Sequence, residues 1–252
     1  MTKNKSPEAL IDSNRKAAVS ISVFFPCYNE QDNITRTVEQ ALAVLEKLTD
    51  DFEVIIVDDG SSDSTGQIAD RIADQNSTVT VVHHPTNLGY GDALQSGFRA
   101  ATKKLVFYTD GDGQFDIGEM PPLLPLINRY DIVSCYRLNR QDNLIRKING
   151  WAWTKVVCFL FGLKIRDIDC AFKLYKREIF DKIHLVSTGA LIDTEILVRA
   201  VRKGYTVTQE PVHHYPRRAG EQTGANLRVI FRAFKELIKL HREIRKESKK
   251  LN

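Results

Sequence analysis

Two stretches of this 252-residue chain, VSISVFFPCYNE at residues 19–30 and DFEVIIVDDGSS at residues 51–62, decide the fold class. Each is a run of β-branched and aromatic residues that ends abruptly in polar, turn-forming residues, which is typical of a buried strand. Between them, residues 32–48 repeat apolar side chains every three or four positions, as a helix with one buried face does. Strand, helix and strand in this order predict a unit of parallel sheet.

The same alternation continues toward the C-terminus. Further strand patterns occur at 79–82, 105–108 and 132–134, and further helix patterns at 64–73 and 92–101. Beyond residue 143 helical patterns dominate, at 151–161, at 191–202 and in a long terminal helix, with one strand-like segment at 205–209. We therefore predict an α/β fold with a Rossmann-like, mostly parallel sheet, helices on both faces and a C-terminal amphipathic helix.

Charge is unevenly distributed along the chain. The whole sequence has 36 basic and 32 acidic residues, a formal net charge of +4. Residues 226–252 contain nine basic and three acidic residues, a net of +6, so the rest of the chain carries −2. A nearly neutral body argues against a nucleic-acid-binding protein. We expect a flexible lead-in at 1–18, a globular domain at 19–225 and a basic helix at 226–252.

Cysteine use and hydropathy predict where the protein works. The four cysteines have neither the paired spacing of a zinc site nor the density of a disulfide scaffold, which favours a reducing, cytoplasmic setting. The polar N-terminal segment does not resemble a secretory signal. The longest apolar run, residues 156–163, is far shorter than the roughly 20 residues that span a bilayer, so we expect no transmembrane segment.

Polar residues follow four of the expected strands, at the ends where parallel sheets bind ligands. The most informative are Asp110 and Asp112, because two carboxylates one residue apart at a turn can chelate a divalent cation, and Gln114 adds an oxygen. Mg²⁺ and Mn²⁺ prefer such ligands. Taken alone, the motif is also an ordinary turn. The other three polar segments are 26–30, 58–62 and 136–137.

Two of the remaining patterns suit a nucleotide. Asp58 and Asp59 could accept hydrogen bonds from a base or ribose, or could only stabilise a turn. The glycine-rich residues 87–94 allow close approach of backbone to a ligand, but they lack the spacing of a P-loop or a dinucleotide-binding fingerprint. The adjacent His83 and His84 are expected at surface or turn positions, because neighbouring strand residues point to opposite sides.

Taken together and in order, the motifs PCYNE, VDDGSSDST, NLGYGDAL and DGDGQF resemble those of the family 2 glycosyltransferases with the GT-A fold. The resemblance covers roughly residues 19–225 and is greatest to the branch of dolichol-phosphate mannose synthases and polyprenol-phosphate glycosyltransferases. It implies inverting, metal-dependent transfer of a hexose from a UDP- or GDP-linked sugar to a dolichyl or undecaprenyl phosphate. It further implies a Mg²⁺ or Mn²⁺ cofactor and a place in cell-envelope biogenesis, at the cytoplasmic face of the membrane.

The resemblance also implies roles for single residues at the donor. Asp110, Asp112 and Gln114 would hold the metal against the diphosphate. The residues implied in binding the nucleotide sugar are Pro26, Tyr28, Glu30, Val57, Asp59, Asp110, Gly111, Asp112, Arg137 and Arg217.

Cations are implied at the phosphates. Arg137 and Arg217, together with the metal on Asp112, would stabilise the leaving group, and Lys173 and Arg218 would hold the acceptor phosphate. The family usually has Ser-Lys where this sequence has Gln-Thr at 222–223, so a lysine expected near the phosphates is absent. The second donor-phosphate contact could come from Arg218, or it could be missing.

The need for a general base depends on the acceptor. A phosphate monoester is largely dianionic at neutral pH and can attack unaided, whereas a hydroxyl must lose a proton. If a base exists, Asp193, Glu195 and Asp169 are the candidates; Asp193 and Glu195 could equally stabilise the start of a helix.

Several alternatives stay open at this level. The chain could glycosylate a soluble or polysaccharide acceptor, or could be a non-catalytic nucleotide-sugar-binding module. The aromatic helix at 151–161 could lie in the core or face lipid. The terminal helix could pack on the body, or its basic face could bind an anionic membrane surface. Many bacterial relatives have C-terminal transmembrane hairpins that this sequence lacks, so any membrane contact is expected to be peripheral, with a membrane-protein partner or a homo-oligomer as further possibilities.

Overall fold

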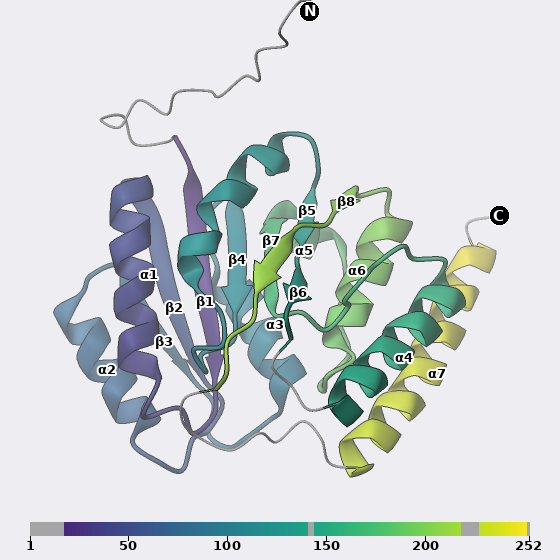
Figure 1. The fold of residues 1–252 in the computed structure, drawn as a ribbon, viewed down its shortest axis with the longest axis horizontal. Helices are drawn as coiled ribbons and strands as arrows, with labels where there is room; N and C mark the ends of the chain where they lie inside the picture. Colours follow the sequence, from purple (N-terminus) through teal and green to yellow (C-terminus); the bar gives the residue numbers. More distant parts are fainter. Residues whose placement is uncertain (1–17, 141–143, 218–226, 251–252) are drawn as a thin grey trace, which may run out of the picture.

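The structure, a computed structural model, describes residues 18–140, 144–217 and 227–250 and has the predicted α/β architecture (Figure 1). Its first elements are β1 (Ser20–Cys27), α1 (Ile34–Leu48), β2 (Asp51–Asp58), α2 (Thr65–Gln75), β3 (Val79–His83), α3 (Tyr90–Ala100) and β4 (Leu105–Thr109). Two 3-10 helices, η1 (Ile117–Glu119) and η2 (Pro121–Asn128), precede β5 (Ile132–Ser134) and β6 (Tyr136–Leu138). The later elements are α4 (Leu144–Phe161), β7 (Phe172–Lys176), α5 (Glu178–Lys182), α6 (Ile192–Arg202), β8 (Val207–Thr208), β9 (Pro211–His213) and α7 (Leu227–Lys250).

Seven of these strands form one central sheet in the order β3-β2-β1-β4-β7-β5-β8. β1 runs parallel to β2 and β4, and β2 runs parallel to β3, so the carboxyl ends of these four strands share one edge. At that edge Cys27 lies opposite Asp58. The segments that follow β1, β2 and β4 therefore lie next to one another, as the prediction requires. β6 and β9 form a separate two-stranded parallel sheet.

The centre of the sheet corrects the sequence analysis at β7. Helical patterns dominate that part of the sequence, yet β7 lies antiparallel between β4 and β5. Its alternation is complete, since Phe172 and Leu174 point into one apolar cluster and Tyr175 into the other. Lys173 made this strand hard to predict, because a lysine is seldom fully buried, whereas this one is. Residues 136–137, expected as a polar loop, also belong to a strand, β6.

Helices cover both faces of the sheet, as predicted. Val23 and Phe25 of β1 join an apolar cluster with α1 and the 3-10 helices, whereas Phe24 joins a second cluster with α3, α6 and α7. Phe24 stacks on Tyr108 with ring centroids 5.4 Å apart and meets Phe98 of α3 edge-on at 4.9 Å. Both faces of β1 and β4 are thus packed, which holds their carboxyl ends in place.

The terminal helix α7 packs on the body of the protein. Leu237, Leu240 and Ile244 are buried in the cluster that contains α3 and α6, so one of the two alternatives left open by the sequence, packing, is observed for this face. Nowhere in the described ranges is a helix long and apolar enough to cross a membrane. The lead-in expected at residues 1–18 lies almost wholly outside the described residues, and the division of the chain into three parts stays a prediction.

The contact between α3 and β1 yields a stability prediction. Gly97 lies so close to the ring of Phe24 that a Cβ atom there would overlap it. We expect Gly97→Ala to lower the free energy of unfolding by about 1–3 kcal/mol, because Phe24 is enclosed by Tyr108 and Phe98 and cannot move aside freely. Urea denaturation followed by circular dichroism measures the change.

Gly150→Ala in α4 is the matched control. A Cβ atom there would lie 2.5 Å from Nη1 of Arg140, the end of a flexible side chain that can move away. This substitution should leave stability unchanged or raise it by up to about 1 kcal/mol, through better helix propensity. Equal destabilisation by the two substitutions would contradict the packing described for α3.

Candidate active site

The carboxyl ends of β1 and β4 are packed directly against each other. Gly111, which follows β4, has no room for a side chain: a Cβ atom there would lie 2.6 Å from Sγ of Cys27 at the end of β1. Thr37 of α1 donates from its hydroxyl to the carbonyl oxygen of Gly111 at 3.4 Å. These contacts fix the backbone turn that carries Asp110 and Asp112.

Asp110 and Asp112 bring two carboxyl groups together at this turn. Burial, and after it the charges of Asp112 and Asp193, raise the pKa of Asp110 to about 8. Tyr90 at the start of α3 donates from Oη to Oδ1 of Asp110 at 3.1 Å, which opposes the rise. A cation bound between the two carboxylates would offset their repulsion, so these oxygens fit a hard divalent ion such as Mg²⁺ or Mn²⁺.

Gln114 lies beside the pair. Its backbone N–H donates to Oδ1 of Asp112 at 3.0 Å, and its side-chain amide donates to the carbonyl of Tyr215 at 3.1 Å, which leaves Oε1 as the atom that could reach a metal. Over the described part of the chain, no group of three or more His, Cys, Asp or Glu side chains could hold a metal by itself. A metal here would need water or donor phosphates to complete its coordination, which is common for Mg²⁺.

Arg217, in the segment that follows β9, also contacts this turn. Its guanidinium is hydrogen-bonded to Oε1 of Glu30 after β1 and lies 3.4 Å from Oδ2 of Asp112. Tyr215 anchors the segment through its N–H, which donates to the carbonyl of Gln114 at 2.9 Å. The structure therefore brings together Glu30, Asp112 and Arg217, three residues that the sequence assigned to the donor.

Glu30 is nearly buried at this junction. Burial raises the pKa of its carboxyl, and hydrogen bonds from Asn33 and Arg217 oppose the rise. The Asn33 amide donates to Oε2 at 2.7 Å. Tyr28 is exposed nearby and presents its ring to solvent, whereas Pro26 is buried and Val57 is fully buried in the apolar core. Val57 therefore offers no side-chain surface to a ligand, so the nucleoside contact expected of it would have to come from its backbone.

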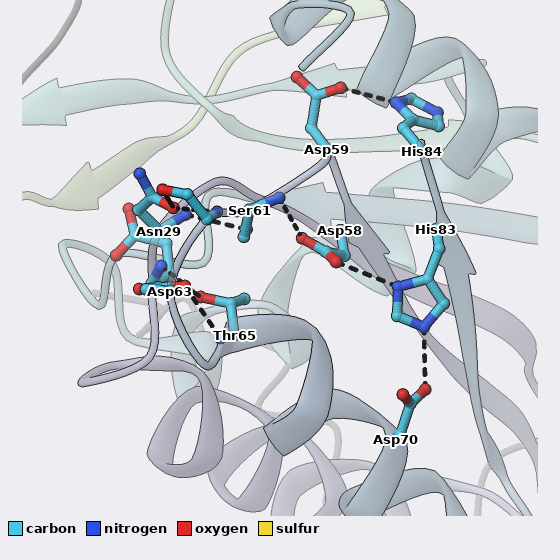
Figure 2. A network of polar contacts seen from close by, with 11 residues as sticks. Asn29, Asp58, Asp59, Ser61, Asp63, Thr65, Asp70, His83 and His84 are labelled. Atoms are coloured by element: carbon cyan, nitrogen blue, oxygen red, sulfur yellow. Dashed lines mark hydrogen bonds and ion pairs between the residues drawn. The ribbon is translucent and has the colours of Figure 1, made fainter. Parts of the chain in front are cut away.

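The end of β2 is held by two histidine–aspartate pairs, drawn in Figure 2. Nδ1 of His84 lies 2.6 Å from Oδ1 of Asp59, and the backbone N–H groups of Leu88 and Gly89 donate to the same carboxylate at 2.9 Å each. The Asp59 side chain thus binds the glycine-rich loop of its own chain, where a nucleoside contact was expected. The His84 side chain is only 8% exposed, so of the two positions expected for it, surface or turn, the structure shows a loop position directly after β3.

The neighbouring pair forms a bridge between β2 and α2. His83 contacts Asp58 through Nδ1 at 3.0 Å and Asp70 through Nε2 at 2.9 Å, and these hydrogen bonds raise its pKa, Asp70 contributing most (Figure 2). Asp58 also accepts from the N–H of Ser61 at 3.0 Å. The carboxylate of Asp58, the last residue of β2, is therefore taken up by contacts within the protein, and Gly66 packs against it.

Arg137 is held by an acidic partner. Its Nε and Nη2 donate to the two oxygens of Asp167 at 2.6 and 2.7 Å, and its side chain is only 10% exposed. Asp167 holds the pKa of Arg137 above its ordinary value, and Arg137 holds the pKa of Asp167 below its own. The sequence placed Arg137 at a donor phosphate; in the structure its guanidinium is bidentate on Asp167.

Lys173 and Asp193 are partners in the interior. Nζ of Lys173 lies 2.5 Å from Oδ1 of Asp193 and 3.1 Å from Oη of Tyr108, which also donates to Asp193. The Lys173 side chain has no exposed surface and that of Asp193 is 3% exposed. The buried ammonium cannot reach an acceptor phosphate directly, which differs from the role expected for Lys173. Asp193 is closed off from an incoming hydroxyl and lies in the first turn of α6, as the alternative to a general base expected.

The other two candidate bases, Glu195 and Asp169, differ in their access to solvent. Glu195 is fully buried and accepts from the N–H groups of Val186 and Ser187 and from Nε of Arg199 at 2.7 Å, so it stabilises a loop. Asp169 is half-buried, and burial together with the charges of Asp193 and Asp167 raises its pKa to about 7. Of the three candidates, Asp169 is the one whose carboxyl has access to solvent.

Two residues of the site were not predicted from the sequence, and one predicted residue is not described by the structure. Tyr90 and Tyr108 connect Asp110 with the Lys173–Asp193 pair. Tyr90 lies inside the glycine-rich motif, where it could have been singled out, but Tyr108 reads only as the end of an apolar strand. Arg218 lies outside the described residues.

Comparisons with known proteins agree on the family. The model of glycosyl transferase family 2 matches residues 22–184. Glycosyltransferase AglD of Haloferax volcanii is 33% identical over 211 residues, which are 80% of this chain and 34% of that protein. The undecaprenyl-phosphate 4-deoxy-4-formamido-L-arabinose transferase of an Enterobacter species is 32% identical over 219 residues, 85% of this chain and 65% of that protein. The chain thus spans about a third and just under two thirds of these curated relatives.

Solved structures show the same fold at low identity. Mannosyl-3-phosphoglycerate synthase from Rubrobacter xylanophilus matches 92% of this chain and 75% of its own, with a TM-score of 0.69 and 17% identity. Glucosyl-3-phosphoglycerate synthase from Mycobacterium tuberculosis, crystallised with Mn²⁺, uridine diphosphate and glucosyl-3-phosphoglycerate, matches 89% of this chain and 77% of its own, with a TM-score of 0.61 and 19% identity.

The raised pKa of Asp110 gives a prediction for metal binding. Mn²⁺ would displace the proton that Asp110 holds below about pH 8, so the affinity should rise with pH, by up to about tenfold per unit, and level off above it. Calorimetric titration with Mn²⁺ over that range measures this. Tyr90→Phe removes a hydrogen bond that lowers the pKa of Asp110, and should move the levelling-off to higher pH. An affinity for Mn²⁺ that does not change below pH 8 would contradict the assignment.

Proposed function

Because the chain belongs to glycosyl transferase family 2, we propose that it transfers a hexose from a UDP- or GDP-linked sugar to a polyprenyl phosphate, with inversion at the anomeric carbon. The observation that carries the proposal is the Asp110–Asp112 turn at the carboxyl end of β4, with Arg217 beside it. A binding module has no chemical need for paired carboxylates whose repulsion a metal would relieve.

The acceptor class is supported by similarity of sequence. The Enterobacter relative is named for transfer to undecaprenyl phosphate, and its match covers 85% of this chain. The donor class is supported by the fold neighbour that was crystallised with Mn²⁺ and uridine diphosphate. The choice between UDP and GDP would depend on the loops around Tyr28, Asp59 and residues 79–89.

At the donor, we assign the diphosphate to the edge between β1 and β4. Asp110, Asp112 and Oε1 of Gln114 would hold Mg²⁺ or Mn²⁺, which when bound neutralises charge that develops on the leaving diphosphate. Arg217 already lies beside Asp112 and would turn from Glu30 and Asp112 toward the phosphates. Tyr28 offers an exposed ring for the base, and Asp59 would support the nucleoside site indirectly, through the loop at residues 87–89.

The reaction would be a single in-line displacement. An acceptor phosphate oxygen forms the new bond to the anomeric carbon, the bond to the donor diphosphate breaks, and the nucleoside diphosphate leaves with that electron pair. Because the acceptor phosphate is already ionised, no general base is required. With a hydroxyl acceptor, Asp169 would be the base, since its pKa of about 7 suits proton transfer.

The interior cations then act as positioning residues. Lys173 and Tyr108 hold Asp193, and the charge of Asp193 raises the pKa of Asp110. Arg137, bound to Asp167, would orient the segment at residues 167–169 that includes Asp169. The direct phosphate contacts proposed for this chain therefore come from Arg217 and, from outside the described residues, Arg218.

We place the reaction at the cytoplasmic face of a membrane, with the protein bound peripherally. A polyprenyl phosphate lies in the bilayer with its phosphate at the headgroup level, so the active site must reach that layer. The net charge of +6 on residues 226–252 supports attraction to anionic lipids.

The test is a transfer assay with Asp112→Asn. Purified protein, Mn²⁺, labelled UDP- and GDP-sugars and undecaprenyl phosphate in detergent should give label in the organic phase. Asp112→Asn keeps the hydrogen bond from Gln114 but loses the charge, and should lower kcat/KM at least about 100-fold. Asp116→Asn, an exposed position that keeps its own hydrogen bond from Gly118, is the control and should stay within about twofold.

Each other outcome is informative. Label only in an aqueous product would support the alternative, a soluble or polysaccharide acceptor. Nucleotide binding without turnover under any condition would mean a binding module. Undiminished transfer by Asp112→Asn would overturn the metal assignment.

A further inference from the structure

Helix α4 has one face that packs on the protein. Thr154 and Val157 are buried, and the Trp153 ring meets the Phe234 ring of α7 edge-on at 5.3 Å. Phe161 at the end of α4 lies 5.6 Å from the ring of His241, also in α7. α4 and α7 thus lie side by side at the margin of the molecule, beyond α6 and away from β3 (Figure 1).

The opposite face of α4 is apolar and exposed. Leu144, Ile148, Trp151 and Phe159 are 71%, 54%, 63% and 88% exposed, and we call them the α4 stripe. Their spacing of four, three and eight residues places them on one side of the helix. Large apolar side chains with this exposure, aligned on one helix, are typical of a surface that contacts another phase or molecule.

Basic side chains lie within the stripe and beside it. Lys155 lies within it, between Trp151 and Phe159, and Lys147 lies beside it; both are exposed. On α7 the half-exposed Phe234 and Ile238 are followed, on the same side of the helix, by the exposed Arg242 and Arg245. The two helices therefore present apolar side chains with basic residues among them.

This combination favours one occupant, an anionic lipid surface. In a two-fold symmetric dimer through this face, the same cations would meet themselves, with Lys155 of each copy in the centre of the contact. An anionic bilayer instead offers negative headgroups to the cations and acyl chains to the aromatic residues, and each nearby cation strengthens the attraction.

We propose that the α4 stripe is the membrane-docking surface of this protein, inserting at the boundary between headgroups and acyl chains while the cations of α4 and α7 contact anionic headgroups. This assigns the peripheral binding of the proposed function to a specific face, and rests on that function for its purpose. Docking through this face would hold the protein, and with it the active site, close to a lipid-borne phosphate.

The first test uses the full chain and co-sedimentation with vesicles of phosphatidylcholine, with and without phosphatidylglycerol. Wild type should bind the anionic vesicles and lose binding at high salt. A double variant, Trp151→Ser with Phe159→Ser, should bind at least about tenfold more weakly. Val201→Ser, at a 40% exposed position on α6, is the control for loss of exposed apolar surface and should bind as wild type does.

The second test locates the contact, because Trp151 and Trp153 are the two tryptophans of the chain. In Trp153→Phe the remaining Trp151 should shift its emission to the blue with anionic vesicles and be quenched by brominated lipid. In Trp151→Phe the remaining Trp153, packed against Phe234, should respond little. An unresponsive Trp151, or equal binding by the double variant and wild type, would overturn the proposal.

Two further results together would also overturn the proposal: wild type does not bind vesicles, and it forms a concentration-dependent dimer that the double variant abolishes. The α4 stripe would then be an interface between two copies of the chain. Transfer to undecaprenyl phosphate in detergent separates this proposal from the proposed function, since detergent removes the need for docking. Normal transfer in detergent without vesicle binding would contradict the docking surface and leave the proposed function intact. Vesicle binding that depends on the α4 stripe, without transfer, would support the docking surface and contradict the proposed transfer activity.

Discussion

The repulsion between Asp110 and Asp112 is the constraint on which the rest of the site depends. Two carboxylates at one turn, close to the buried Asp193, are stable only with compensating positive charge. The protein supplies part of it: Arg217 joins Asp112 to Glu30, and Lys173 neutralises Asp193. Burial and this repulsion together raise the pKa of Asp110 to about 8, and a divalent cation is the simplest group that would offset both.

Segments from distant parts of the sequence meet at this turn. Parallel pairing of β1 with β2 and β4 brings Glu30 and Asp112 to one edge, and Gly111 lets β4 end directly against Cys27. The segment after β9 returns to the same edge, where Tyr215 and Gln114 exchange hydrogen bonds and deliver Arg217. Residues almost two hundred positions apart thus share one charge balance, which explains why the sequence keeps separate polar motifs at several strand ends.

Much of this could be predicted from the sequence, and the exceptions have physical reasons. The five strands that precede residue 135 follow from local patterns, as do the polar segments after three of them and after the segment at 132–134. The assignment of Glu30, Asp112 and Arg217 to one site followed from the family resemblance. β7 was missed because Lys173, which marks a surface in most strands, is buried through its pairing with Asp193. The pairing of Arg137 with Asp167 and the turning of Asp59 toward its own loop depend on long-range contacts that a one-dimensional pattern does not contain. Exposure of the α4 stripe was equally hidden, since an apolar helix reads the same in a core and at a surface.

The central claim is that these carboxylates form a cation site at the donor diphosphate. The most direct measurement is a crystal structure with Mn²⁺ and a nucleoside diphosphate, with the metal located by its anomalous scattering. The account predicts a peak in contact with Asp110 and Asp112, the guanidinium of Arg217 moved from Asp112 to the diphosphate, and the Lys173–Asp193 pair unchanged. A nucleotide bound at this edge without a metal on either aspartate, with Arg217 still on Asp112, would contradict it.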